Sequence, residues 1–442
     1  MADRSSVLWL AGIAALFAVQ VSPLWYPTPD SLRYLSTARS VALELRLAEL
    51  GSPVLSFPPG YSLLLAPAFF SAPRPFLAIS LLHLGLAILL IAGVERWARR
   101  SVGDGGLVTA MVGVNVSLWI HFRRPLSELA FMTAAVWTVQ ALNELATRGF
   151  PWRRALIASL AVAALPQIRE VGVTFAAGFL CLAVLRSISL CGVALFLVSL
   201  ASLGCFIVYD LMAAAQAPGP AATHLHGLLA PPMPHLDWAA EAIRLRVGEI
   251  GRLLVPGMAL RPEPQAWLDR GMILHLPVLA VVGAGWLRLL RAGDVFAATL
   301  PFYTAVYVVW GFDAATRYML PMLPLLAGSL WVALERLSSL RSILFRLLVA
   351  AHLVVAAGHW LVHDLPSARR CDAEWPAVDA IAAEWPSADA VASAAELTKC
   401  GKVMLGFRLD RPVAERAAAK PAVAMRDHPA PGRARSGAHR DL

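Results

Sequence analysis

Residues 22–70 read SPLWYPTPDSLRYLSTARSVALELRLAELGSPVLSFPPGYSLLLAPAFF and follow an apolar run at 6–22 that is long enough to cross a membrane. The stretch holds an acidic residue, Asp30, then an amphipathic segment, and then a double proline followed by Tyr61. Its last part, PPGYSLLLAPAFF, is too short to cross a bilayer, so we predict an interfacial or re-entrant helix there. A carboxylate and an aromatic corner are thus expected at the membrane surface, directly after a first span.

The composition is that of a chain that lies mostly in lipid. Of its 442 residues, 58% are hydrophobic and 15% are charged, and the mean hydropathy is +0.63. Soluble globular chains contain about a quarter charged residues. We therefore predict an all-α polytopic membrane protein, because helices satisfy their own backbone hydrogen bonds in lipid. The net charge of +9 is taken as a record of topology and not of nucleic-acid binding, since Lys and Arg collect in cytoplasmic loops.

Basic clusters recur between the apolar runs and predict the topology. They lie at 96–100, 148–154, 186, 288–291 and 336–346. If all of them face the cytoplasm, about eleven transmembrane helices alternate without conflict. These spans are expected at roughly 6–22, 76–95, 105–121, 126–146, 155–168, 171–186, 189–213, 272–288, 294–310, 318–335 and 343–363. The first run lacks a small-x-small cleavage site, so we expect it to be retained as a span. The prediction is a multi-pass protein of the inner membrane, with its N-terminus cytoplasmic and its C-terminus extracytoplasmic.

The chain divides into three expected regions. Residues 1–363 form the transmembrane domain, with one long external loop at about 215–271. Residues 364–415 are expected to form a small extracytoplasmic α/β tail, in which 375–413 predicts a helix followed by two short strands. Residues 416–442 are rich in Pro, Ala and Arg without periodicity, which is typical of disorder.

The five cysteines fall into two groups. Cys181, Cys191 and Cys205 lie in apolar runs, as small core residues do. Cys371 and Cys400 lie on the predicted outer side, where the compartment permits disulfides, so we expect them to form a bridge. The alternative is two free thiols. The chain has no CxxC pair, which argues against a structural metal site.

Ionisable residues gather at the predicted outer ends of the spans, and several have a plain structural explanation. Asp30 could cap the amphipathic helix or pair with Arg33 at helical spacing. Arg123 and Arg124 could reach toward lipid headgroups, and Arg317 with Tyr318 could anchor a span at the interface.

Arg169 and Glu170 interrupt an apolar region after Pro166. Two charges between short half-spans are costly unless they line a cavity or pair with each other. This position therefore favours a functional role. Glu44, Arg46 and Glu49, further back in the chain, are interpreted as a solvated helix face.

Four segments resemble the GT-C superfamily of membrane glycosyltransferases, in particular bacterial lipid-linked sugar transferases similar to protein O-mannosyltransferases and to the aminoarabinose transferase of lipid A. They are PTPDSLRYLSTARSVA (27–42), FPPGYSLLLAPAFF (57–70), RRPLSELAFMTAAVW (123–137) and TRYMLPMLPLLAGSLWVALERL (316–337). No segment is decisive alone. Their order, their spacing and their shared outer side carry the resemblance.

The resemblance implies transfer of a sugar from a polyprenyl-phosphate-linked donor to a glycan, lipid or protein acceptor on the outer face of the membrane. Asp30 matches the acid of the first loop and would act as the general base. Cations would stabilise the leaving phosphate, and the candidates are Arg317, Arg169, Arg123 and Arg124. Further candidates for substrate contact are Arg33, Tyr61, Glu170 and Tyr318.

Glu128, in the third segment, would orient the acceptor or help to hold a divalent metal ion. The family commonly has a second acid beside the first-loop Asp, and here Ser31 takes that place. We therefore assign no metal ligands and keep a divalent metal ion as an alternative only.

Two other classes of function compete with this reading. A transporter or flippase for a lipid or polar solute would place ionisable residues near mid-span and show a repeat between its halves. We find no internal repeat, and the ionisable residues cluster at outer ends instead. A non-catalytic assembly protein of the envelope would not need Asp30 beside outer arginines.

Overall fold

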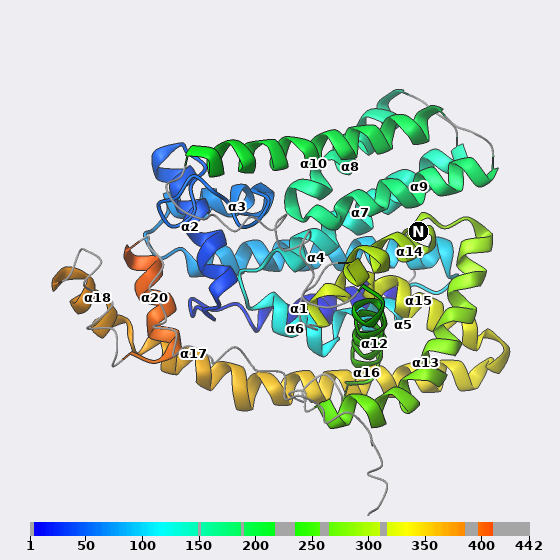
Figure 1. Ribbon diagram of the computed structural model, residues 1–442. Helices are drawn as coiled ribbons and strands as arrows, with labels where there is room; N and C mark the ends of the chain where they lie inside the picture. The colour runs from blue at the N-terminus through cyan, green and yellow to red at the C-terminus, as the bar shows by residue number, and fades with distance from the viewer. Residues whose placement is uncertain are drawn as a thin grey trace, which may run out of the picture.

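Figure 1 shows the computed structural model of the chain, in which long helices run side by side along one direction. The structure describes residues 4–148, 152–186, 190–216, 235–256, 265–309, 316–384 and 397–409. Within these ranges there is no β-strand, and one isolated antiparallel bridge joins Glu49 to Ser52. The predominantly helical fold expected from the composition is confirmed.

The first half of the chain supplies the helices that surround the opening stretch. They are α1 (Arg4–Ala18), α2 (Pro29–Glu44), α3 (Gly60–Leu65), the 3₁₀ helix η1 (Ala66–Phe70), α4 (Phe76–Ser101), α5 (Gly106–Gly113), α6 (Val116–Phe122), α7 (Ser127–Arg148), α8 (Trp152–Ile168), the 3₁₀ turn η2 (Glu170–Gly172), α9 (Val173–Arg186) and α10 (Leu190–Gln216).

The second half completes the bundle and forms the tail. Its helices are α12 (His235–Leu254), α13 (Gln265–Ala292), α14 (Val295–Val309), the 3₁₀ turns η4 (Thr316–Tyr318) and η5 (Leu320–Met322), α15 (Leu323–Ala333), η6 (Leu334–Leu337), α16 (Ser339–His359), the π-helical turn η7 (Trp360–Asp364), α17 (Leu365–Asp372), α18 (Trp375–Glu384) and α20 (Lys399–Leu409).

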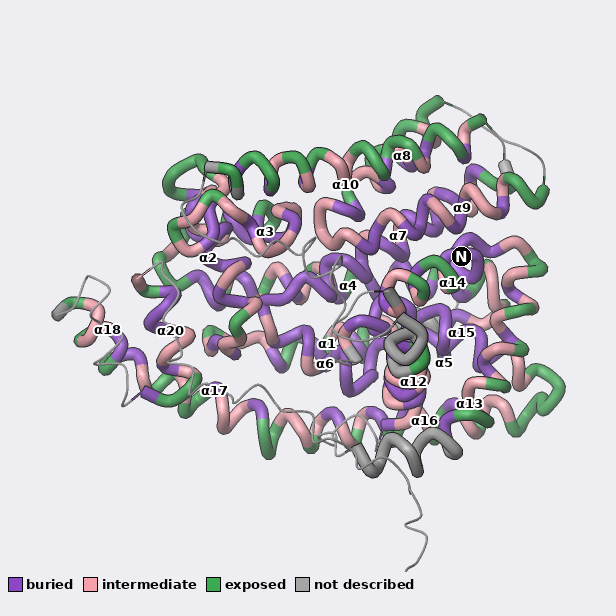
Figure 2. The backbone as a smooth tube through the Cα atoms, in the orientation of Figure 1, coloured by how far each residue is buried: buried purple, intermediate pink, exposed green. Residues whose placement is uncertain are grey.

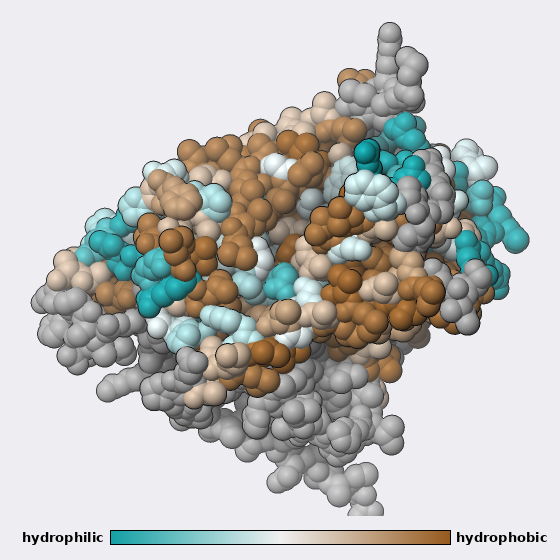
Figure 3. Space-filling model, turned by 90° about the horizontal axis from the view of Figure 1, so that it is seen from above, coloured by the Kyte–Doolittle hydropathy of each residue, from teal (hydrophilic) through white to brown (hydrophobic). Residues whose placement is uncertain are grey.

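The bundle has the surface of a multi-pass membrane protein. By length and composition, four helical segments of the described chain could each cross a membrane: Phe76–Ser101, Leu190–Ala213, Leu320–Leu337 and Ser339–Ala383. Figure 3 shows a broad area of apolar residues between polar groups at two ends of the molecule. Other expected spans coincide with helices outside this set of four, and the one at 105–121 is divided into α5 and α6, where Asn115 caps α6. The total of about eleven spans stays a prediction.

Large side chains fill the middle of the bundle. Trp97, Phe131, Phe175, Phe296 and Trp331 are fully buried there. In Figure 2 the inner helices α7 and α15 are largely buried, whereas α8 and α10 show long exposed faces. Those exposed faces carry leucines and valines, which is the pattern of a surface that meets lipid and not water.

One end of the bundle gathers α2, α3, α17, α18 and α20, and we call it the α2 end (Figure 1). A second apolar core lies there. The Trp25 ring stacks on the ring of Phe76 at 5.1 Å and lies 6.3 Å from the ring of Trp375. Arg39 on α2 donates a hydrogen bond to the backbone oxygen of Phe407 on α20. The tail is therefore packed against α2, the helix that contains Asp30.

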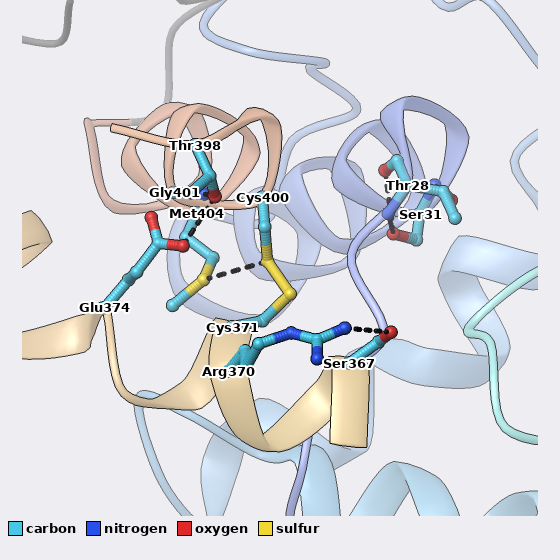
Figure 4. The surroundings of a disulfide bond; sticks show 10 residues. All are labelled: Thr28, Ser31, Ser367, Arg370, Cys371, Glu374, Thr398, Cys400, Gly401 and Met404. Carbon is cyan, nitrogen blue, oxygen red and sulfur yellow. Dashed lines mark hydrogen bonds between the residues drawn. A yellow bond between two sulfur atoms is a disulfide. The ribbon is translucent and has the colours of Figure 1, made fainter. Parts of the chain in front are cut away.

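The described part of the tail is helical: it contains α18 and α20, and the two short strands expected within 375–413 do not occur among its described residues. Cys400, Met404 and Phe407 recur every three or four residues and lie on one side of α20, which is helical spacing. A disulfide joins Cys400 to Cys371 on α17, the pairing suggested by the sequence (Figure 4). Residues 385–396 and 410–442, which include part of the expected α/β tail and the expected disordered end, lie outside the described residues. The expected boundary at 363/364 falls within a continuous helical stretch.

Two further features of the fold position the site. The segment expected as a long external loop contains α12, which packs against α13, α14, α15 and η4. Gly60, the first residue of α3, sits against the end of α8, where an added Cβ would lie 2.5 Å from the carbonyl oxygen of Gln167. Only glycine lets α3 approach α8 this closely.

Candidate active site

Asp30 is free of the capping role that the sequence left open to it. In the capping box of α2, the backbone N–H of Ser31 donates to Thr28 Oγ1 at 3.0 Å, and the N–H of Thr28 donates to Ser31 Oγ at 2.8 Å (Figure 4). Pro29 occupies the first helical position, where its missing N–H costs nothing. Thr28 is therefore the N-cap, and the carboxylate of Asp30 in the first turn is available for another partner.

That partner is Arg317, from η4. Arg317 Nη1 donates to Asp30 Oδ2 at 2.5 Å, across a sequence separation of 287 residues. The two side chains keep exposed fractions of 28% and 26%, so solvent still reaches the pair. Arg317 Nη2 also donates to the hydroxyl of Tyr318 at 3.3 Å. The pairing of Asp30 with Arg33, considered from helical spacing, does not form.

Arg33 instead ties α2 to the loop that follows it. Its Nη1 donates to Ser56 Oγ, and its Nε lies 3.6 Å from Glu49 Oε1. Glu49 is buried and accepts hydrogen bonds at 2.6 Å from both the backbone and the hydroxyl of Ser56. The expectation that Glu49 belongs to a solvated face is therefore wrong, because the loop folds back over it. Glu44 and Arg46 do form an exposed pair.

Glu128 lies between two cations at the beginning of α7. Its Oε1 accepts from Arg169 Nη1 at 2.9 Å and lies 4.0 Å from Arg317 Nε. The side chain is only 3% exposed, and in the described part of the chain its Oε2 has no hydrogen-bond partner. Arg169 reaches it from the break between α8 and α9, where the backbone leaves the helix after Ile168. The chain break after Pro166 thus places a cation against a buried acid.

These groups surround a pocket of about 200 Å³ beside α2. Its lining residues are Asp30, Arg33, Tyr34, Phe57, Leu126, Ser127, Glu128, Arg169, Glu170, Val171, Tyr307, Arg317 and Tyr318. The structure therefore brings together seven of the residues singled out in the sequence: Asp30, Arg33, Glu128, Arg169, Glu170, Arg317 and Tyr318.

The sequence did not identify several residues that line this pocket. Tyr34 donates to or accepts from Ser127 at 3.0 Å, and its ring packs against that of Phe57. Tyr34 follows Asp30 by four residues on one helix, and this spacing could have identified it. Tyr307 lies inside the apolar run of α14, where no local signal separates it from a core residue.

Three other sequence candidates are not among the lining residues. Tyr61 is buried, and its hydroxyl shares a hydrogen bond of 2.8 Å with His83 Nε2. Arg123 is buried in an ion pair with Asp364, at the end of the π-helical turn. Arg124 follows it, outside the pocket.

The charges of the pocket balance one another without a ligand. Burial alone would lower the pKa of Arg317, but Glu128, Tyr318 and Asp30 outweigh it and hold that pKa above its usual value. Arg317 therefore stays protonated at any physiological pH. Burial also raises the pKa of Tyr34, which keeps its hydroxyl protonated. The pocket thus presents two arginines that are paired with two carboxylates, next to tyrosine hydroxyl groups that bond to Ser127 and Arg317.

The residues of the pocket suit an anion better than a metal ion. Asp30 and Glu128 are each paired with an arginine. In the described part of the chain, no group of three or more His, Cys, Asp or Glu side chains is arranged to hold a metal ion. We assign no metal to the site.

Comparisons with known proteins identify the fold. No protein-family model matches the chain, and no curated protein matches it by sequence. Among solved structures, it is similar to ArnT from Cupriavidus metallidurans bound to undecaprenyl phosphate, with a TM-score of 0.53 and 12% identity over 92% of this chain and 84% of that one. The apo state of ArnT matches with a TM-score of 0.50, 14% identity and the same coverage. The chain therefore shares its fold with these ArnT structures.

Proposed function

We propose that the protein transfers a sugar from a polyprenyl-phosphate-linked donor to an acceptor on the outer face of the cytoplasmic membrane. One observation carries the proposal: two carboxylates and two arginines from four distant parts of the chain meet in one pocket of this fold. The crystallised complex of ArnT with undecaprenyl phosphate supports a polyprenyl phosphate as the lipid half of the donor.

Asp30 is the proposed general base. It is partly exposed and lies at the edge of the pocket, where an acceptor hydroxyl or amine can reach it. In the transfer, the acceptor proton passes to the Asp30 carboxylate while the acceptor oxygen or nitrogen forms the bond to the sugar C1. The bond between C1 and the phosphate oxygen breaks, and its electron pair leaves with the polyprenyl phosphate. A positioned base of this kind contributes about 10²–10⁴-fold in rate.

Arg317 and Arg169 are the proposed partners of the phosphate. Guanidinium groups bind phosphate oxygens through two parallel N–H donors and stabilise the charge that develops on the leaving group. The Nε of Arg317 is buried and has no hydrogen-bond partner within the described residues, so a further donor is available there. Glu128 holds both arginines in place from behind.

The ion pair between Asp30 and Arg317 gives the reaction an order. While the pair is closed, Arg317 neutralises the carboxylate that must accept the proton. A donor phosphate competes for the same guanidinium, and once it binds, Asp30 loses its cation. A carboxylate without a nearby cation accepts a proton more readily. Donor binding thus prepares the base before the acceptor reacts.

Transfer can be tested with purified protein and polyprenyl-phosphate sugars extracted from membranes. We expect the wild-type protein to release free polyprenyl phosphate from the donor when an acceptor fraction is present, and the Asp30→Asn variant not to do so. Intact donor after incubation with wild-type protein and acceptor would contradict the proposal. If the donor instead crossed the bilayer of sealed vesicles with its sugar attached, the protein would be a flippase.

The orientation belongs to the same proposal. The N-terminus is placed in the cytoplasm and the pocket and tail outside, because the basic clusters lie at the opposite ends of the helices. Reporter fusions at residues 150 and 370 should give opposite sidedness. The same sidedness at both positions would place the pocket on the wrong face for an external acceptor.

A further inference from the structure

A buried cation lies behind two tyrosines of the pocket. Arg246 belongs to α12 and is only 2% exposed. Its guanidinium carbon lies 5.7 Å from the ring centre of Tyr307 and 5.6 Å from that of Tyr318. Both tyrosines line the pocket, whereas Arg246 is not among its lining residues. Arg246 therefore touches the wall of the pocket from its far side.

The setting of Arg246 is costly for a charged group. Its Nη1 forms an ion pair of 2.9 Å with Glu249, one turn further along α12, and Glu249 is fully buried. In the described part of the chain, Arg246 Nε is buried without a hydrogen-bond partner. Replacing a buried ion pair by apolar groups of similar volume is often neutral or stabilising, so such a pair is weak evidence for a role in stability. The contacts of Arg246 with the two tyrosine rings indicate a role at the pocket instead.

Tyr318 is the point at which three arginines converge. The guanidinium carbons of Arg317, Arg246 and Arg169 lie 5.1, 5.6 and 5.9 Å from the centre of its ring. All three distances are within the range of cation–π attraction. Two of these arginines line the pocket, and the third approaches the ring from α12.

Two more tyrosines contact Tyr318, one at its backbone and one at its ring. Tyr303 donates its hydroxyl to the backbone oxygen of Tyr318 at 2.8 Å. The ring of Tyr307 lies 5.2 Å from that of Tyr303 and 5.1 Å from that of Tyr318. Because Arg317 donates to the Tyr318 hydroxyl, the placement of this ring fixes part of the placement of the Arg317 guanidinium.

We propose that Arg246 is a positioning residue for donor binding: through the Tyr318 ring it holds Arg317 toward the pocket, and its charge adds to the field that attracts the phosphate. The inference rests on the proposed function, since it assigns the donor phosphate to Arg317. It makes α12 a part of the donor site, although no residue of α12 is among the described lining residues of the pocket. Loss of Arg246 should weaken binding of the donor and leave the KM for the acceptor unchanged.

The test replaces the whole buried pair. Arg246→Met alone leaves Glu249 buried without its cation and could prevent folding, so the informative variant is Arg246→Met/Glu249→Leu, which removes both charges and keeps the volume. The matched control is Glu95→Leu/Arg99→Met, which removes an ion pair within one turn of α4, at the basic end of that helix and outside the pocket. Arg246→Lys keeps the charge but loses the flat guanidinium that lies against the rings.

The measurement is the affinity of each purified full-length protein for polyprenyl phosphate, together with its melting temperature. We expect about tenfold weaker binding for Arg246→Met/Glu249→Leu, which corresponds to about 1.4 kcal/mol. Arg246→Lys should fall between this variant and the wild type, the control should match the wild type, and both double variants should melt within a few degrees of it. The donor KM should rise with the dissociation constant, and the acceptor KM should not change.

The outcomes separate this inference from the proposed function. If the wild-type protein binds no polyprenyl phosphate, the proposed function fails and this inference fails with it. If the wild type binds it and Arg246→Met/Glu249→Leu binds it equally well, only the inference fails. Equal weakening in the control variant would also overturn it, because the effect would then arise from loss of any intrahelical ion pair.

Discussion

Arg317 and Arg123 look alike in the sequence, but the structure places them in different surroundings. Each lies at the predicted outer end of a span, and each forms a close ion pair with an aspartate from a distant part of the chain. The side chains of Arg317 and Asp30 are 28% and 26% exposed, whereas those of Arg123 and Asp364 are 2% and 10% exposed. Arg317 borders a pocket of about 200 Å³, and the cavity beside Arg123 measures about 20 Å³, close to the space of one water molecule.

The comparison shows that space beside an ion pair, more than the pair itself, marks a site. Asp364 also receives a hydrogen bond of 3.1 Å from His359, and the ring of Tyr26 lies 5.9 Å from the guanidinium carbon of Arg123. This network joins the connection between α6 and α7 to the π-helical turn. Side chains of the same chain surround this network and leave little room for a substrate. Its loss should therefore affect folding more than chemistry.

The largest effect on transfer is expected at the partly exposed pair of Asp30 and Arg317. Asp30→Asn keeps the size of the side chain but removes the base, and the capping box of α2 does not depend on it. We expect normal expression and transfer reduced by about two to four orders of magnitude. The variant should also bind polyprenyl phosphate more tightly than the wild type, because Arg317 no longer has a competing carboxylate. Near-normal transfer would move the role of base to Glu128, and weaker binding would contradict the competition for Arg317.

The second largest loss of transfer is expected from substitutions of Arg317. Arg317→Ala removes one of the two proposed phosphate partners and should lower transfer by about 10²-fold, the usual cost of one such donor. Arg317→Lys keeps the charge without the two-pronged geometry, so we expect a loss of about tenfold. The measurement is kcat/KM for the donor. Unchanged donor KM and kcat in Arg317→Ala would reduce Arg317 to an interface anchor.

The buried pair of Arg123 and Asp364 should affect the stability of the protein more than its transfer activity. Arg123→Met removes the cation that is paired with the buried carboxylate of Asp364, and we expect a destabilisation of about 3–5 kcal/mol. The double variant Arg123→Met/Asp364→Leu should recover most of it. Thermal melts and donor binding of the folded fraction test both parts. If the donor affinity of the double variant fell by more than about threefold, which corresponds to about 0.7 kcal/mol, Arg123 would again be a candidate substrate-binding residue.

The smallest effect on transfer is expected at the tail. In the chain-entropy model, the bridge between Cys371 and Cys400 closes a loop of about thirty residues and stabilises the tail by roughly 3–4 kcal/mol. Cys371→Ser/Cys400→Ser should therefore make the tail easier to cleave with protease and change transfer little. In membranes prepared without reductant, an alkylating agent should label neither cysteine until reductant is added. Immediate labelling of both would contradict the bridge and the outer location of the tail.

Much of the fold and half of the site could be predicted because charges are rare in this chain. Asp30, Glu128, Arg169 and Arg317 stand out against apolar surroundings, and burying them is costly unless they meet. Their shared location could thus be inferred from topology. Their pairing could not, because Asp30 and Arg317 are distant in sequence and Arg33 is the nearer cation by helical spacing.

The remaining parts of the site carry no local signal. Tyr307 is one aromatic residue in an apolar helix, where a core position and a pocket wall look alike. Arg246 lies in a segment that charge and prolines suggested to be a loop, and only the packing of α12 reveals its role. The sequence predicted strands in the tail because a short apolar run fits either period, and the helix α20 follows the helical one.

Gly60 limits how this protein could be rebuilt from parts. The first loop and the PPGY corner look like a cassette that could be exchanged with the loop of another chain to change what the pocket accepts. The corner, however, docks through the missing side chain of Gly60 onto the carbonyl of Gln167, two residues before Arg169. A graft that brings any other residue to position 60 would wedge the loop away from the end of α8 and so separate Asp30 from its cations. The glycine and the end of α8 must therefore be transplanted together.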